Sequence, residues 1–229
     1  METTTLKTRL SPQIQELELE QFVLQLEVDG LCVVPPEKTG VAPETIKAIA
    51  ERLLFEAEEI VGCGFDLDEG PKAELTMSAD ENVIAQFSGD RGEPTQFLVQ
   101  QLCARDRLFR DLAINPIGVA LIRHLIGQNA TRFSSHNAFI KWQGEFGYGQ
   151  NLGLHCDQIA VPRPWGRNAL TANTNWCITD YSLDGGALAY VPGSHRRMEP
   201  PRFPEAVDLA VPVEAPAGSL VVFHGATWH

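Results

Sequence analysis

The residue types and spacing in this sequence that point most strongly to a chemical function are those of a histidine and an aspartate two positions apart. They are His155 and Asp157, in the segment GLHCDQ at residues 153–158. If that segment is extended, its side chains alternate between two faces, so His155 and Asp157 point the same way while Cys156 points the opposite way. An imidazole and a carboxylate that converge like this are two of the three ligands in the two-histidine, one-carboxylate set that binds ferrous iron and leaves coordination positions open. Alone the pair is weak evidence, because histidines that hydrogen-bond in a core or cap a turn are more common.

The third ligand has to come from another part of the chain. Two histidines, His224 and His229, lie in the segment SLVVFHGATWH at residues 219–229. Another, His195, closes the glycine-rich segment GGALAYVPGSH at residues 185–195. It follows Pro-Gly-Ser, a sequence typical of a tight turn, so we interpret His195 as a turn residue rather than a ligand.

The elements before residue 128 are predicted to be mainly helical. Ser11-Pro12 is typical of an N-cap followed by proline in the first turn of a helix, which should end near residues 29–30. Residues 43–60 carry apolar side chains at three- and four-residue steps, which predicts an amphipathic helix. Further helices are predicted over residues 95–112 and 119–126. Residues 61–94 are rich in glycine and acidic residues and are predicted to be mostly loop, with one short strand near residues 83–85.

Beyond residue 127 short apolar runs alternate with turn sequences. They predict strands over residues 139–142, around His155, and over residues 171–179, 187–191 and 219–223, besides an early strand at residues 31–34. Short strands at such spacing favour a sandwich or a jelly roll. We therefore predict an α+β chain with one domain over residues 1–229, in which helices of residues 1–127 pack on one sheet of a jelly roll formed by residues 128–229.

The composition narrows the classes of partner. The 229 residues suffice for one sizeable core, and 18 basic against 30 acidic residues give a formal net charge of −12. Such a charge disfavours nucleic acids and anionic membrane surfaces as partners. The sequence shows neither a signal-peptide pattern nor an apolar run long enough to span a bilayer, so a cytoplasmic location is expected. Its five cysteines lack C-x-x-C spacing and are expected to be reduced and mostly buried.

Three motifs in this order resemble the phytanoyl-CoA dioxygenase family of iron- and 2-oxoglutarate-dependent oxygenases. They are H-x-D at residues 155–157, a glycine-rich turn and strand that end in P-G-S-H at residues 192–195, and G-S-x-x-x-F-H-x-x-x-x-H at residues 218–229. The early segment LEVDGLCVVPP at residues 26–36 also resembles that family. The resemblance covers most of the chain and implies a double-stranded β-helix, the jelly-roll core of cupin-like proteins.

Carried over residue by residue, the resemblance makes His155, Asp157 and His229 the Fe(II) ligands and the catalytic centre. The family has its distal ligand at the second histidine of F-H-x-x-x-x-H, so His224 is expected to be a structural residue of its strand. The implied reaction is oxidation of a small-molecule substrate by dioxygen, with decarboxylation of the cosubstrate 2-oxoglutarate to succinate. The aspartate favours hydroxylation or a related oxidation, because halogenating relatives lack this carboxylate.

Three residues are candidates for binding 2-oxoglutarate. The family often has an aromatic residue at the position of Trp176, and Thr174 would share its face of the strand. Lys141 could pair with a carboxylate. A buried tryptophan and a solvated surface lysine are the alternatives. The family's arginine for the distal carboxylate of 2-oxoglutarate lies on the strand after the distal histidine, whereas this sequence ends at His229. We therefore expect the sequence to be truncated, with C-terminal strands missing.

The loop at residues 159–168 is expected to act as a substrate lid. Arg163, Trp165 and Arg167 could contact an anionic or aromatic group there, although an exposed loop needs no ligand to explain it. We expect a small or medium-sized hydrophobic metabolite as substrate. Two alternatives stay open: a metal- or ligand-binding jelly roll without oxygen chemistry, and an enzyme that uses zinc, manganese or nickel, since imidazole and carboxylate ligands do not select iron alone.

Overall fold

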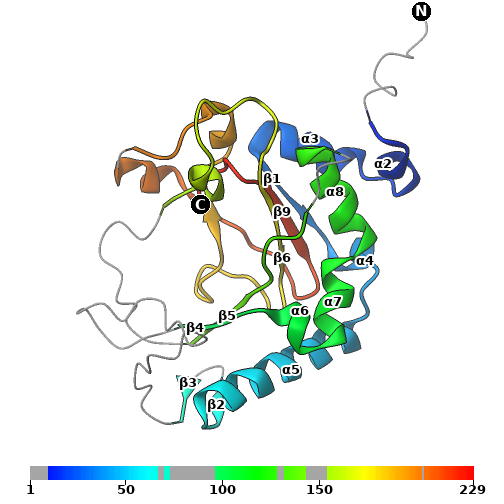
Figure 1. Ribbon diagram of the computed structural model, residues 1–229, viewed down its shortest axis with the longest axis vertical. Coiled ribbons are helices and arrows are strands. Elements are labelled where there is room, and N and C mark those ends of the chain that lie inside the picture. The colour runs from blue at the N-terminus through cyan, green and yellow to red at the C-terminus, as the bar shows by residue number, and fades with distance from the viewer. Residues whose placement is uncertain (1–9, 67–69, 73–95, 128–131, 143–153, 203) are drawn as a thin grey trace, which may run out of the picture.

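A three-stranded antiparallel sheet lies at the centre of the computed structural model, which describes residues 10–66, 70–72, 96–127, 132–142, 154–202 and 204–229. Its strand order is β1-β9-β6, formed by β1 (Leu31–Val34), β9 (Leu220–His224) and β6 (Ala172–Trp176). A strand from the helix-rich part of the sequence therefore pairs with one from the other end of the chain (Figure 1). The two parts of the predicted domain share one sheet rather than separating along the sequence.

The central strand β9 is buried on both faces. Leu220 and Val222 pack against the helices α2 (Pro12–Glu16), α3 (Glu20–Asp29) and α8 (Pro116–Ile126), whereas Val221 and Phe223 belong to a second apolar cluster on the opposite face. This alternation is the period of two that strand geometry imposes. Each such side chain contributes about 1.5–3 kcal/mol by its burial, so β9 is firmly held where the chain turns toward His229.

The first predicted helix is interrupted. Ser11 caps α2, and its Oγ accepts a hydrogen bond from the Ile14 N–H at 3.3 Å. The backbone of Glu18 then adopts a φ of 52°, which no α-helix tolerates, so α3 starts as a separate helix. It ends at Gly30, whose left-handed φ of 81° favours glycine. The sequence correctly predicted the start and the end of this region but not the break within it.

The helix predicted over residues 95–112 is wrong in its first part. Residues 96–99 form β4 (Gln96–Val99), which pairs with β5 (Ala138–Lys141), and only then follow α6 (Leu102–Arg105) and α7 (Arg107–Ala113). Phe97 and Val99 of β4 are buried in a core that also includes residues of α5 (Pro43–Val61). Pairing with a distant strand has thus overridden the local helical pattern, as tertiary context often does.

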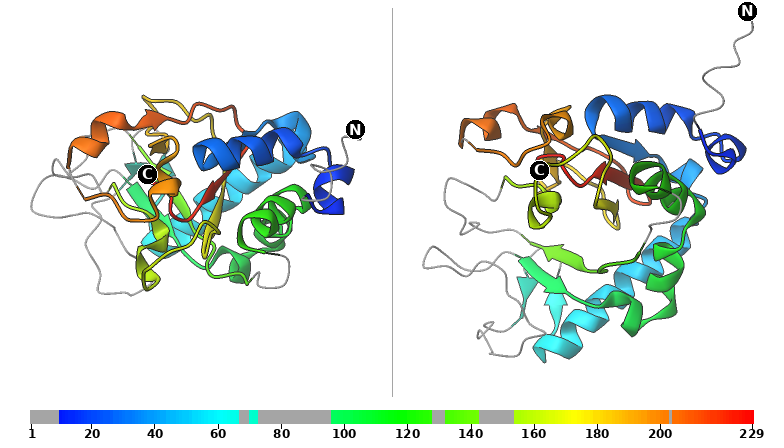
Figure 2. Two further views of the ribbon diagram at one scale, coloured as in Figure 1. Left: turned by 90° about the horizontal axis from the view of Figure 1, so that it is seen from above. Right: turned by 45° about the horizontal axis from the view of Figure 1, so that its top comes forward.

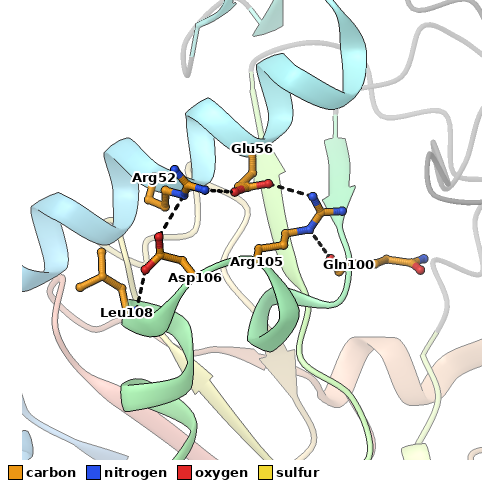
Figure 3. A network of polar contacts seen from close by, with 6 residues as sticks. All are labelled: Arg52, Glu56, Gln100, Arg105, Asp106 and Leu108. Carbon is orange, nitrogen blue, oxygen red and sulfur yellow. Dashed lines mark hydrogen bonds and ion pairs between the residues drawn. The ribbon is translucent and has the colours of Figure 1, made fainter.

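A polar network joins α5 to the short helices that follow β4 (Figure 3). The buried carboxylate of Glu56 pairs with Arg52 on its own helix and with Arg105 at 2.8 Å. Arg52 also reaches Asp106, whose other oxygen accepts the Leu108 N–H at 2.9 Å and caps α7. One buried acid shared by two arginines therefore fixes how these helices meet.

The helices form an arc around one side of the β1-β9-β6 sheet and the β4-β5 pair, from α3 past α8 to α5 (Figures 1 and 2). None of the helices in the described ranges is long and apolar enough to cross a membrane. All five cysteines are free thiols, and Cys32, Cys156 and Cys177 are buried. The remaining elements are short: α4 (Pro36–Thr39), β2 (Phe65–Asp66), β3 (Gly70–Pro71), η1 (Asp157–Ala160), β7 (Ala189–Tyr190), η2 (Ser194–Arg197), η3 (Pro204–Leu209) and β8 (Val211–Pro212).

Most strands predicted beyond residue 127 are confirmed, because β5, β6, β7 and β9 each lie in or overlap a predicted run. The segment around His155 is the exception. Residues 154–156 have no regular secondary structure, and η1 begins at Asp157. The strand predicted near residues 83–85 lies outside the described residues.

Candidate metal centre

The structure brings His155, Asp157 and His229 together. One ligand atom from each side chain lies within 4.8 Å of the other two. The Asp157 carboxylate faces both imidazoles, with Oδ1 at 3.5 Å from His155 Nε2 and Oδ2 at 3.6 Å from His229 Nε2. Two imidazole nitrogens and one carboxylate oxygen can thus converge on a single small cation.

His155 and Asp157 share a face although they do not lie in a strand. The residue between them, Cys156, is itself extended, with φ −140° and ψ 142°. Its side chain is fully buried in an apolar cluster with Trp165 and Trp228. Local alternation across one extended residue is therefore sufficient, and the buried thiol directs the two polar side chains to the opposite side.

Backbone hydrogen bonds join the two histidines. The His155 N–H donates to the His229 carbonyl at 3.0 Å, and the His229 N–H donates to the His155 carbonyl at 2.9 Å. The preceding Trp228 is fully buried, its indole N–H donates to the Glu199 carbonyl at 2.7 Å, and its backbone N–H donates to Ser194 Oγ at 2.8 Å. His229 is therefore held in place both by its own backbone hydrogen bonds and by the hydrogen bonds of the neighbouring Trp228.

The tautomer of His229 follows from its contacts. Nδ1 lies 3.0 Å from the Thr227 carbonyl, which can only accept, so Nδ1 carries the proton and Nε2 presents a lone pair toward Asp157. A lone pair that faces a carboxylate is unfavourable unless a cation lies between the two groups. A protonated Nδ1 bonded to a backbone carbonyl is also the usual support of a metal-bound histidine. The donor set thus fits a divalent metal ion.

The protonation states of Asp157 and His229 also suit the binding of a metal ion. Burial raises the pKa of Asp157, but hydrogen bonds from His155 and Asn173 and the charges of both histidines outweigh burial, so the pKa lies below its usual value. Burial lowers the pKa of His229. At neutral pH the carboxylate is ionised and this imidazole is neutral, which are the forms that bind metals.

Exposure of the three side chains is graded. His229 is 8% exposed, Asp157 36% and His155 50%. Phe223 covers the His229 ring, with the ring centroids 4.8 Å apart. The centre is therefore closed at His229 and open at His155, and that open side is where molecules from solvent can approach it.

The other two candidate histidines lie elsewhere. His224 alternates with Phe223 along β9, and both His224 and His195 are buried with their ring centroids 5.3 Å apart. His224 Nδ1 accepts the Ala226 N–H at 3.0 Å, and burial lowers its pKa to about 4. His195 lies in η2, directly after the left-handed Gly193. Neither imidazole joins the three clustered ligands.

The structure places Thr174 and Trp176, the expected contacts of the cosubstrate, on the face of β6 away from the three clustered ligands. Asn173, between Ala172 and Thr174, donates a hydrogen bond to Asp157 Oδ2, so the neighbouring Thr174 and also Trp176 project from the opposite face of β6. There Trp176 packs against apolar core residues, and the Thr174 methyl group lies beside Gly118 of α8. The sequence correctly paired the two residues on one face, but it is the face away from the cluster.

Two of the remaining sequence candidates, Lys141 and Trp165, have structural partners of their own. Lys141 is exposed, and its ammonium donates to the Gly186 carbonyl. Trp165 is buried, and its indole N–H donates to the Val161 carbonyl at 2.9 Å, so it is not free to meet a substrate. Arg163 and Arg167 are exposed. Asn173 was missed, because nothing in the sequence distinguishes an asparagine that meets a carboxylate from any other in a strand.

Comparison with known proteins points to one family. The family model for phytanoyl-CoA dioxygenase (PhyH) matches residues 26–229. Dioxygenase af480 of Aspergillus fumigatus is 35% identical over 138 residues, which are 59% of this chain and 43% of that protein. An uncharacterised protein of Mycobacterium tuberculosis is 40% identical over 68 residues, 30% of this chain and 25% of that protein. The matched segments thus span less than half the length of these curated relatives.

Solved structures share the fold over most of the chain. The epimerase SnoN, determined with ferric iron, alpha-ketoglutarate and nogalamycin RO, is 21% identical with a TM-score of 0.59 and matches 93% of this chain and 76% of that one. The carbocyclase SnoK from nogalamycin biosynthesis is 16% identical with a TM-score of 0.58 and matches 93% and 77%. At these identities the likeness establishes the fold, a double-stranded β-helix with covering helices.

Proposed function

This chain belongs to the phytanoyl-CoA dioxygenase family, and from that premise we propose that it is a non-haem Fe(II)- and 2-oxoglutarate-dependent oxygenase that oxidises a small-molecule substrate. The observation that carries the proposal is the cluster of His155, Asp157 and His229, whose ligand atoms lie within 4.8 Å of one another. Two imidazoles and one carboxylate are the ligand set of this enzyme class.

The roles of the three residues follow from their surroundings. His155 and His229 would bind iron through neutral nitrogens, and Asp157 would neutralise part of the charge of the ion. Iron in this position would supply the reaction with dioxygen that decarboxylates 2-oxoglutarate to succinate and oxidises the substrate. Phe223 and the buried Trp228 exclude water from the side of His229. The cosubstrate and the substrate would therefore approach from the exposed side of His155.

Hydroxylation or a related oxidation is the outcome we favour, because Asp157 retains the carboxylate that halogenating relatives lack. The names of SnoN and SnoK show that this fold also supports epimerisation and ring closure. Analysis of the products, with mass spectrometry to detect one added oxygen atom, distinguishes these outcomes. An unchanged substrate mass would point to epimerisation.

The test of the oxygenase proposal uses the protein with ferrous iron and 2-oxoglutarate in the absence of oxygen. The chelated cosubstrate should give a weak visible charge-transfer band, which bleaches on admission of oxygen as succinate forms. Asp157→Ala should lose both the band and succinate formation. Asp184→Ala, at an exposed aspartate in the turn after β6, is the matched control and should retain both.

The two alternatives give different results in the same experiment. If the wild-type protein binds iron but no band forms, the oxygenase proposal is wrong and a metal-binding module becomes the better interpretation. If protein purified without air contains zinc, manganese or nickel and gains no activity with iron, it is a different metalloenzyme. Metal analysis of the purified protein is therefore made first.

A further inference from the structure

We propose that Asn173 is a positioning residue that holds the Asp157 carboxylate in the orientation in which it faces both histidines. This inference rests on the proposed metal centre. It concerns a residue of β6 that no sequence motif marked. The amide would act through Asp157 and need not touch the metal itself.

Asn173 is the donor and Asp157 the acceptor of the hydrogen bond between them. The Asn173 amide nitrogen donates to Asp157 Oδ2, since an ionised carboxylate can only accept. The same oxygen lies 3.6 Å from His229 Nε2, while Oδ1 lies 3.5 Å from His155 Nε2. With the amide fixed on one oxygen, rotation of the carboxylate is restricted, and each oxygen is kept next to a different imidazole.

The position of Asn173 is set by the sheet. Asn173 pairs directly with Phe223 of β9, and residues opposite each other in an antiparallel pair project from the same face. Phe223 in turn contacts the His229 ring. One cross-strand pair therefore supports two of the three ligands, Asn173 through a hydrogen bond and Phe223 through ring packing.

Asp157 needs such support because it begins a single short turn. Its side chain is 36% exposed, so apolar packing does not immobilise it. Asp157 is the first of the four residues that form η1. A residue that hydrogen-bonds to a metal ligand typically contributes 10–100-fold in metal affinity, and the loss of Asn173 should lie in that range.

The experiment compares Asn173→Leu, which keeps the side-chain shape and removes the amide, with Asn175→Leu. Asn175 has the same residue type on the same face of the same strand, two positions further on. Dissociation constants for Co(II) alone are measured by titration of the absorption spectrum of the metal complex. Asn173→Leu should weaken Co(II) binding by roughly 10–100-fold, and Asn175→Leu by less than about threefold.

A double-mutant cycle shows whether Asn173 acts through Asp157. In an Asp157→Ala background, the further change Asn173→Leu should alter Co(II) affinity by less than about threefold, because the carboxylate it positions is absent. If Asn173→Leu weakened Co(II) binding in that background as much as it does in the wild-type protein, the inference would be overturned. Circular dichroism and thermal unfolding of each metal-free variant verify that the fold is retained.

The outcomes separate this inference from the proposed function. If wild-type protein does not bind Co(II), the metal centre itself is refuted. If wild-type protein binds Co(II) and Asn173→Leu binds it as tightly as Asn175→Leu, the metal centre stands and Asn173 has no positioning role. Should Asn173→Leu prove unfolded, Asn173→Ser is used in the same titration, since its short hydroxyl also fails to reproduce the amide contact.

Discussion

Gly225 is predicted to be irreplaceable because three segments of the site meet at its backbone. Its N–H donates to the Thr171 carbonyl at 2.8 Å, and its carbonyl accepts the Gln158 N–H at 2.8 Å. A Cβ atom at this position would overlap the side chain and the backbone of Thr171, with the Thr171 carbonyl carbon only 2.8 Å away. Backbone cannot rotate aside as a side chain can, so Gly225→Ala must move one of these segments.

The loss in the free energy of unfolding caused by Gly225→Ala can be derived from those contacts. Overpacking a filled site costs about 1–3 kcal/mol, and each weakened backbone hydrogen bond adds about 1 kcal/mol. Gly225→Ala should therefore lower the free energy of unfolding by about 3–5 kcal/mol. It should also weaken metal binding, because the displaced segments carry Asp157 and His229.

Urea unfolding of the metal-free protein, followed by circular dichroism, measures the first effect. Gly166→Ala is the matched control, since a Cβ there meets nothing within 4 Å, and it should change stability by no more than about 0.5 kcal/mol. Adding Thr171→Ala to Gly225→Ala removes the hydroxyl overlap but leaves the carbonyl, so it should restore only part of the loss. Equal stability of Gly225→Ala and Gly166→Ala would refute the reasoning.

Three further predictions test the scaffold and the ligand set. Glu56→Ala leaves Arg52 and Arg105 facing each other and should cost about 2–3 kcal/mol in urea unfolding, since its partners are partly exposed, whereas the exposed Glu51→Ala should cost less than about 0.5 kcal/mol. Because burial lowers the pKa of His224 to about 4, the unfolded state takes up this proton first. The contribution of His224 to the stability of the metal-free protein should therefore fall by about 3 kcal/mol as the pH drops from about 6.5 to 4. His224→Gln should flatten that pH profile, and an unchanged profile would contradict it. Finally, His229→Ala should lose Co(II) binding while His224→Ala keeps it; the reverse result would overturn the choice of the third ligand.

The sequence determined much that depends on local periodicity. The three- and four-residue steps of residues 43–60 predicted α5, and the alternation of LVVFH in β9 follows from the period of a strand. The expected convergence of His155 and Asp157 needed only one extended residue between them, which Cys156 supplies. These inferences succeeded because each concerns neighbours along the chain, whose relative directions the backbone fixes.

Tertiary structure decided which face of each element is used. Whether Asn173 or Thr174 meets the cluster depends on the pairing of β6 with β9 and on the side to which α8 packs, and neither partner lies near β6 in sequence. The same applies to β4, where pairing with β5 replaced a predicted helix. The approach of His229 to His155 also required a pair of backbone hydrogen bonds between residues more than 70 positions apart. Side-chain periodicity identifies two faces of a strand, but only the packing of distant segments determines which face becomes the metal centre.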